Sequence, residues 1–528
     1  MSSYERKSLR ERSPRAFVPY LIILTVLLAG MLALLPAYLR AYVHSYEDTV
    51  VPPTCQSAGY TVHTCRDCGD TYTDEATEPL AHQFGPPKVI RTATAAATGM
   101  KQSVCTLCGA VLQETIPVAP PATFPTIRIT GDSELITKAT RESVVPVKIM
   151  YSGNGQIFST YATLRVQGFT SAGFNKKNYN IRLFEDEALT THAKVDTGYG
   201  EWGGQWRYTL KANWIDCSHA RNIVACRIWS EMVESRKNPD ENLLAAPNNG
   251  CTDGFPVEVY LNGEYYGLYT MNIPKAKWMF GMDEEKYPHS AIITSQMHHS
   301  SNNFRETTNL WSTDDWDVEY CSTGADITWL NESFNRLLSF VSTKSGSEFR
   351  AGIREYMDVD AVIDYAIMCY LMYGPDNWDK NMVLVTYDGV KWIPNLYDAD
   401  CSFGLHWNGS CFYDYGQMDA TVPGNLTEQG MKGTSNWLLT KVLANFKNEF
   451  CTRYRTLRRT VLSEENLIAL ISGFFDPIPA EVYTRDRTRW NPPNPSDSAA
   501  NAANDRSQMF YFIHRRLPLL DRAMNALA

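Results

Sequence analysis

The chain has 528 residues, a formal net charge of −9, and the apolar (44%) and charged (20%) fractions of an ordinary globular protein. This length exceeds what one hydrophobic core usually needs, so it predicts two or more units. The acidic balance excludes a general nucleic-acid-binding protein, and the 12% of aromatic residues excludes a largely disordered chain.

The N-terminus has the pattern of a membrane anchor. A basic tail over residues 1–15 precedes an apolar run over residues 16–39, and a bilayer needs about 20 such residues. The basic excess predicts a cytoplasmic N-terminus and an extracytoplasmic C-terminal domain. A cleaved signal peptide is the alternative, but its apolar region would span only about 7–15 residues. We therefore expect a single-pass protein of the cell membrane, with a juxtamembrane tether over residues 40–52.

Residues 53–118 contain an internal repeat. The segments 59–69 and 99–109 each combine a strand-like stretch, a Cys-x-x-Cys knuckle and a glycine. A repeat at a fixed offset is typical of a small modular array, which we expect to act as a β-rich stalk.

Two Cys-x-x-Cys knuckles in so small a unit favour tetrahedral zinc. The spacing leaves two ligand sets open: both knuckles together, or the first knuckle with an upstream cysteine and a histidine. Disulfides are the competing interpretation for an extracytoplasmic segment, but a Cys-x-x-Cys turn holds a metal more easily than it closes a relaxed disulfide. The candidate zinc ligands are Cys55, Cys65, Cys68, His82, Cys105 and Cys108.

A Pro-rich linker over residues 119–125 leads into a large domain over residues 126–528. Strand-like stretches dominate its first part, an Asn262-Gly263 turn marks a hairpin, and helical patterns dominate from about residue 326. This order predicts an α+β protein with an atypical two-lobed, protein-kinase-like fold.

An acidic motif in the second half of the chain contains the candidate catalytic and metal-binding residues. Asp376 is followed by Asn381, and a predicted β-hairpin then leads to Asp398 and Asp400. Kinase-type phosphotransferases use such a pattern, with an Asp as the base and Asn and Asp as magnesium ligands. We expect Asp376 to accept the proton of the attacking hydroxyl and the other three to bind Mg²⁺. The alternative is two solvated acidic turns, and we expect Asp379 at the surface.

A cation should neutralise the bound phosphates. Lys176 and Lys177 are adjacent, so on a strand they point to opposite faces and only one can enter the cleft; we favour Lys177. Lys211 is a rival, because it lies on a strand just before a helix, as an ATP-binding lysine usually does. Arg221, at a helix start, is a candidate for supporting phosphate or locking the lobes, with a structural salt bridge as the alternative.

Four segments point to one family: residues 166–181, 210–222, 259–269 and the acidic region just described. Together they resemble the CotH kinase-like, or spore coat protein H, family over roughly residues 126–525. The resemblance implies a kinase-like fold that transfers phosphate from ATP to Ser or Thr hydroxyls. The chain departs from the family at Asn175, where a Pro is typical, and at residues 271–274, where a Glu is frequent.

These observations predict a membrane-anchored atypical protein kinase. It would transfer the γ-phosphate of ATP, with Mg²⁺, to Ser or Thr of a cell-surface or coat protein. Its expected partners are ATP, that protein substrate and the membrane, and not nucleic acid. A hypothesis of a different class is a catalytically inactive adhesin or scaffold that keeps the fold, because extracellular ATP is scarce. Transfer of another nucleotide-derived group also stays open.

Overall fold

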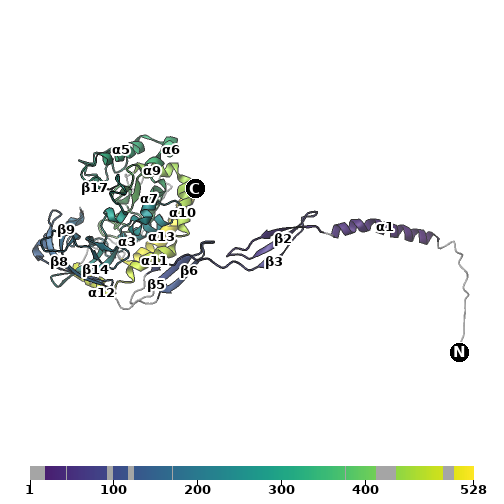
Figure 1. Ribbon diagram of the computed structural model, residues 1–528, viewed down its shortest axis with the longest axis horizontal. Helices are drawn as coiled ribbons and strands as arrows, with labels where there is room; N and C mark the ends of the chain where they lie inside the picture. The colour runs from purple at the N-terminus through teal and green to yellow at the C-terminus, as the bar shows by residue number, and fades with distance from the viewer. Residues whose placement is uncertain are drawn as a thin grey trace, which may run out of the picture. The chain divides into compact units, whose positions relative to one another are not determined.

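The computed structural model describes residues 18–42, 44–91, 99–116, 124–168, 170–374, 376–411, 436–490 and 505–527. The chain divides into two compact units (Figure 1), namely Met1–Lys88 with Lys101–Glu114, and Val89–Met100 with Thr115–Ala528. The predicted basic tail and most of the predicted Pro-rich linker lie outside the described residues.

The expected membrane span is wrong. The first helix is α1 (Val18–Tyr42), but no helix in the described part of the chain is both long and apolar enough to cross a bilayer. The predictions of a transmembrane helix over residues 16–39 and of a single-pass membrane location are therefore corrected.

Each copy of the repeat forms a small three-stranded sheet. The first contains β1 (Tyr46–Val51), β2 (Gly59–Cys65) and β3 (Thr71–Thr77), and the second contains β4 (Lys88–Arg91), β5 (Gly99–Val104) and β6 (Val111–Ile116). The two knuckles occupy equivalent places, with Cys65 at the end of β2 and Cys105 directly after β5. The glycine that closes each knuckle has a positive φ, 74° at Gly69 and 76° at Gly109, a conformation that favours glycine.

A closed seven-stranded barrel forms the β part of the large unit, in the order β10-β13-β15-β14-β7-β8-β9. Along β8 buried and exposed residues alternate, as expected for a strand with one face toward a core. The predicted hairpin is confirmed, since Asn262 and Gly263 join antiparallel β14 and β15 with positive φ values of 50° and 90°. The barrel strands are β7 (Thr126–Thr130), β8 (Val145–Gly153), β9 (Gln156–Gln167), β10 (Asn178–Phe184), β13 (Arg207–Lys211), β14 (Gly254–Leu261) and β15 (Glu264–Asn272).

Helices and a second sheet make up the rest of the large unit. The sheet has the order β17-β16-β18-β19. Its strands are β16 (Ala291–Ser295), β17 (Trp316–Cys321), β18 (Val383–Thr386) and β19 (Ile393–Asn395). A separate two-stranded sheet pairs β11 (Val195–Asp196) with β12 (Gly204–Gln205). The helices are α2 (Ser133–Thr137), α3 (Arg221–Glu234), α4 (Glu241–Ala245), α5 (Thr328–Thr343), α6 (Gly346–Tyr356), α7 (Val359–Met372), α9 (Trp437–Asn445), α10 (Lys447–Arg458), α11 (Glu464–Phe475), α12 (Ala480–Trp490) and α13 (Arg506–Leu527).

One continuous hydrophobic core joins the barrel to the helices. Within the large unit, β8, β9 and β14 lie at one end and α5, α6 and α9 at the other, with α3 and α7 between them (Figure 1). Every residue of α7 except Asp360 is buried, so this helix is apolar nearly all round, as a central helix must be. The α+β class is therefore confirmed, with a barrel-like sheet as its β part.

Candidate functional site

The acidic motif lies where α7 and the hairpin of β18 and β19 meet. Helix α7 ends at Met372, its cap residue Tyr373 has a positive φ of 52°, and the short helical turn η5 (Asp376–Trp378) follows. Strand β18 starts just after Asn381, and β19 ends just before Asp398. Because these strands pair antiparallel, their start and end meet at one edge. The Asn381 side-chain amide accordingly donates to the Asp398 carbonyl at 3.2 Å.

A lysine from the barrel faces this edge. Lys211 ends β13, and its Nζ lies 3.1 Å from Oδ1 of Asp398. Burial would lower the pKa of Lys211, but the Asp398 carboxylate beside it raises this pKa overall. Burial would likewise raise the pKa of Asp398, but Lys211, with Lys275 and Lys380, lowers it overall. Both groups of the pair are therefore charged at neutral pH.

The pKa of the neighbouring Asp400 is raised, whereas that of Asp398 is lowered. Burial, and next the negative charge of Asp398, raise the pKa of Asp400 to about 7, with Asp376 adding to the rise. The carboxylates of Asp376 and Asp398 thus both disfavour a negative charge on Asp400. The three carboxylates do not converge into a ready-made ligand triad, since among the described residues only cysteine and histidine groups gather ligand atoms within 4.8 Å of one another.

Two basic side chains flank Asp376. Its Oδ2 lies 3.9 Å from Nζ of Lys380, and its Oδ1 lies 3.9 Å from Nε2 of His298. The Asp376 side chain is 29% exposed, so a substrate hydroxyl can approach it. His298 lies in a polar loop, and sequence reasoning did not assign it to the site, because it precedes Asp379 by 81 residues and has no characteristic spacing.

The expectation that Asp379 lies at the surface is wrong. Its side chain is fully buried, and it accepts hydrogen bonds from His298 Nδ1 at 2.6 Å and from Asn303 Nδ2 at 3.1 Å. The loop folds against β16, where the Ser295 hydroxyl donates to the Asp379 carbonyl. The Ser295 carbonyl accepts from the backbone N–H of Asn381. The hydrogen bond to Asp379 raises the pKa of His298. Asp379 therefore orients His298 toward the site.

The adjacent lysines lie apart from the carboxylates. Lys176 is buried, and its Nζ contacts Asp486 at 2.8 Å and the Leu268 carbonyl at 2.6 Å. Burial lowers the pKa of Lys176 despite this ion pair. The Nζ of Lys177 instead donates to the Ala172 carbonyl at 2.8 Å. Of the three predicted phosphate-binding lysines, only Lys211 contacts an acidic residue of the motif.

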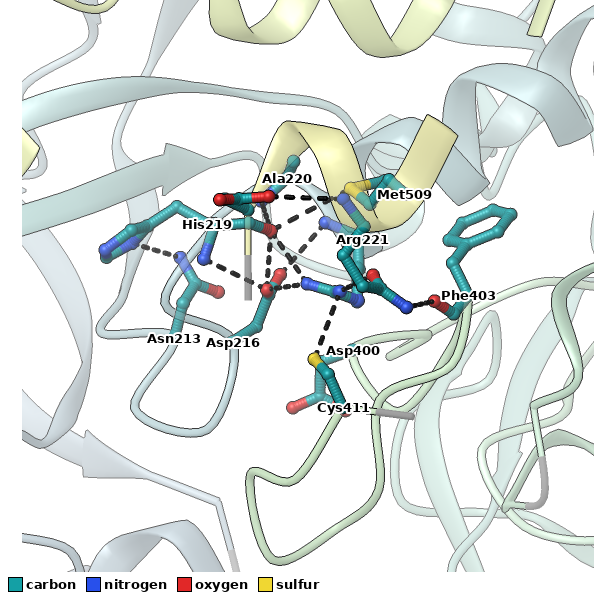
Figure 2. A network of polar contacts seen from close by, with 12 residues as sticks. Asn213, Asp216, His219, Ala220, Arg221, Asp400, Phe403, Cys411 and Met509 are labelled. Atoms are coloured by element: carbon teal, nitrogen blue, oxygen red, sulfur yellow. Dashed lines mark hydrogen bonds and ion pairs between the residues drawn. The ribbon is translucent and has the colours of Figure 1, made fainter. Parts of the chain in front are cut away.

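Arg221 lies at the centre of a buried polar network (Figure 2). Its guanidinium contacts Asp216 at 2.5 Å, the Ser402 carbonyl at 3.0 Å and Gln508 Oε1 at 2.5 Å. Because Ser402 follows Asp400 closely and Gln508 belongs to α13, Arg221 ties the acidic loop to two helices. The geometry fits the structural salt bridge among the roles considered for this arginine.

Helix α13 contacts both chain segments that carry the acidic residues. Gln508 Nε2 donates to the Phe403 carbonyl at 2.9 Å, next to the loop that carries Asp400. Arg516 Nε donates to the Tyr370 carbonyl at 2.8 Å, in the last turn of α7 before Asp376. Both contacts are buried, so α13 fixes the two chain segments from which the acidic side chains project.

The structure groups the repeat's cysteines differently from both predicted ligand sets. Cys65 and Cys68 lie with His44, whereas Cys105 and Cys108 lie with Cys55 and His82. All thirteen cysteines are free thiols. The repeat therefore contains two Cys/His groups with the composition of a metal site, as the sequence led us to expect, but neither group follows the expected combination.

Residues 164–520 match the family model described as CotH kinase protein. This range includes every predicted residue of the acidic site and its lysines, and it excludes the repeat unit. No curated protein is significantly similar to the chain. The predicted family resemblance is confirmed.

Proposed function

The chain belongs to the CotH kinase family, and on that premise we propose that it transfers the γ-phosphate of ATP to Ser or Thr of a coat or cell-surface protein. The observation that carries this proposal is the Lys211–Asp398 ion pair beside Asp400 and Asn381, with Asp376 nearby. A lysine next to clustered carboxylate and amide oxygens is the arrangement that phosphoryl transfer requires.

The donor set fits magnesium. Carboxylate and amide oxygens are the ligands that Mg²⁺ prefers. Burial, and next the negative charge of Asp398, raise the pKa of Asp400, and a divalent cation would offset that charge. Asp398, Asp400 and Asn381 would hold the ion, which would neutralise charge on the phosphate oxygens. The second proposed cofactor, structural Zn²⁺, belongs to the repeat unit and takes no part in this chemistry.

Asp376 is proposed as the base. It takes the proton of the Ser or Thr hydroxyl while that oxygen attacks the γ-phosphorus and ADP leaves. Lys380 and His298, 3.9 Å from its two oxygens, orient the carboxylate without covering it. Lys211 stays protonated beside Asp398 and can donate hydrogen bonds to ATP phosphate oxygens.

Two of the predicted lysines test this proposal. Lys211→Met should weaken Mg-ATP binding by about 10–100-fold, because it removes a charge-assisted hydrogen bond to phosphate. Lys177→Met is the matched control and should bind normally, since Lys177 contacts only a backbone carbonyl among the described residues. Calorimetric titration of the full chain measures both, with circular dichroism as a check on folding. Equal losses in both variants, or in neither, would contradict the role of Lys211.

The titration of Asp400 predicts a pH dependence of Mg²⁺ binding. Its carboxyl, with a pKa raised to about 7, is mostly protonated below that pH and ionised above it. Since Mg²⁺ binds the ionised form, affinity for Mg²⁺ should fall as the pH drops from about 8 to about 6, approaching tenfold per unit at the acid end. Asp400→Asn should flatten the profile, whereas Asp360→Asn, at the exposed start of α7, should preserve it. A flat profile in the unaltered chain would exclude Asp400 as a ligand.

A scaffold that merely keeps the kinase-like fold remains the competing function. It predicts that the purified chain gains no thermal stability from Mg-ATP. A stabilisation that disappears in Asp398→Asn favours the kinase, and mass spectrometry of the chain incubated with Mg-ATP identifies the group transferred.

A further inference from the structure

Four soft ligand atoms from the two copies of the repeat come together. The thiols of Cys55, Cys105 and Cys108 and a ring nitrogen of His82 all lie within 4.8 Å of one another. Cys55 Sγ is 4.0 Å from Cys105 Sγ, and Cys108 Sγ is 3.3 Å from His82 Nδ1. Tetrahedral zinc, with bonds of about 2.3 Å to sulfur and about 2.0 Å to nitrogen, needs separations of about 3.8 Å between two sulfur atoms and about 3.5 Å between sulfur and nitrogen. Both observed distances lie within about 0.2 Å of these values.

A second group repeats part of this arrangement. His44 Nδ1 lies 3.4 Å from Cys65 Sγ and 3.2 Å from Cys68 Sγ. In both copies, therefore, a histidine upstream of the sheet faces the two thiols of the knuckle. Within the described residues this group has three members, two of them exposed, whereas the other gains Cys55 as a fourth.

The two sheets of the repeat bury few side chains. Every residue of β3 is exposed, and among the few buried residues of the repeat are Cys55, Cys65 and Cys105. A unit of this size rarely folds on so small a core, and natural small domains add disulfides or a structural metal. Since all of its thiols are free, the metal is the remaining means of stabilisation.

We propose that the repeat unit binds two zinc ions at unequal sites. Cys55, His82, Cys105 and Cys108 form a closed structural site, and because Cys55 comes from the first copy and the knuckle from the second, this ion joins the two copies. His44, Cys65 and Cys68 form a three-ligand site whose fourth position faces solvent, and this site binds zinc more weakly. This assignment is independent of phosphoryl transfer.

Metal analysis of the full chain, purified with zinc and without chelator, tests the proposal. We expect about two zinc ions per chain, falling to about one in Cys55→Ser and also in Cys68→Ser, as each variant loses one site. A weak chelator should remove the ion lost in Cys68→Ser first. Cys217→Ser, in the large unit, is the matched control and should keep both ions. Limited proteolysis should cut the repeat faster in Cys55→Ser than in the control.

Specific results would overturn this assignment. A zinc-free chain with disulfides among these cysteines would exclude both sites. Zinc content unchanged in Cys55→Ser would exclude the site that joins the copies, and content unchanged in Cys68→Ser would exclude the three-ligand site. Substitution with Co²⁺ gives an independent readout, since tetrahedral thiolate coordination produces strong visible absorption that Cys55→Ser should diminish.

Discussion

Asp376→Asn and Asp398→Asn should each reduce phosphate transfer at least about 100-fold, yet they should differ in nucleotide binding. Asp376 is placed to take a proton, so its amide variant should still bind Mg-ATP. Asp398 pairs with Lys211 and is a proposed metal ligand, so its variant should lose most Mg-ATP binding as well. Transfer of radiolabelled γ-phosphate to a Ser/Thr-containing protein or to the chain itself, together with calorimetry, measures both effects.

Asp388→Asn is the matched control for this pair. Asp388 lies in the exposed turn of the same β18–β19 hairpin, where its carboxylate accepts backbone N–H groups from Val390 and Lys391. An amide oxygen can accept these bonds, so transfer should stay close to normal. Full activity in Asp376→Asn would remove the base from the mechanism. Unchanged Mg-ATP affinity in Asp398→Asn would remove that residue from the metal site.

Arg221→Met should lower the free energy of unfolding by about 3–5 kcal/mol, because it leaves the buried carboxylate of Asp216 without its cation. Both side chains are essentially inaccessible to water, so neither can be rehydrated in the folded chain. The variant should also lose Mg-ATP affinity, since Arg221 holds the loop that carries Asp400. Urea denaturation followed by intrinsic fluorescence measures the stability.

Two further variants separate lost charge pairing from lost packing. Adding Asp216→Asn to Arg221→Met should recover part of the stability, since no unpaired buried charge then remains. Arg182→Met, at an exposed position of β10, should change stability by less than about 0.5 kcal/mol. If Arg221→Met left stability unchanged while weakening ATP binding, the alternative role of Arg221 as a phosphate ligand would be favoured instead.

The parts of the site that the sequence predicts are those set by local geometry. Asn381 and Asp398 flank a hairpin, and antiparallel pairing brings the ends of a hairpin together whatever surrounds it. Lys176 and Lys177, in contrast, precede β10 and do not lie on a strand, so the alternation expected for them does not apply. The sequence cannot say which of the two is buried, because the partner of Lys176 is Asp486, 310 residues later.

The predictions that failed depend on distant or non-repeating contacts. The loop of Asp379 is buried by residues of β16 and of the polar loop near His298, which no local pattern connects to it. In the repeat, the sequence predicted either one site from both knuckles or a site around the first knuckle, whereas Cys55 lies with the second knuckle. The predicted span over residues 16–39 is wrong as well, because no helix in the described part of the chain is long and apolar enough to cross a membrane.

The contacts of α13 have a consequence for how the protein matures. Residues 506–527 leave the ribosome after every acidic residue of the site, and chains generally emerge at about 5–20 residues per second. Until Gln508 and Arg516 arrive, the segments bearing Asp400 and Asp376 lack the bonds that brace them. In a nascent chain these two segments are therefore braced only once α13 has been synthesised and has docked.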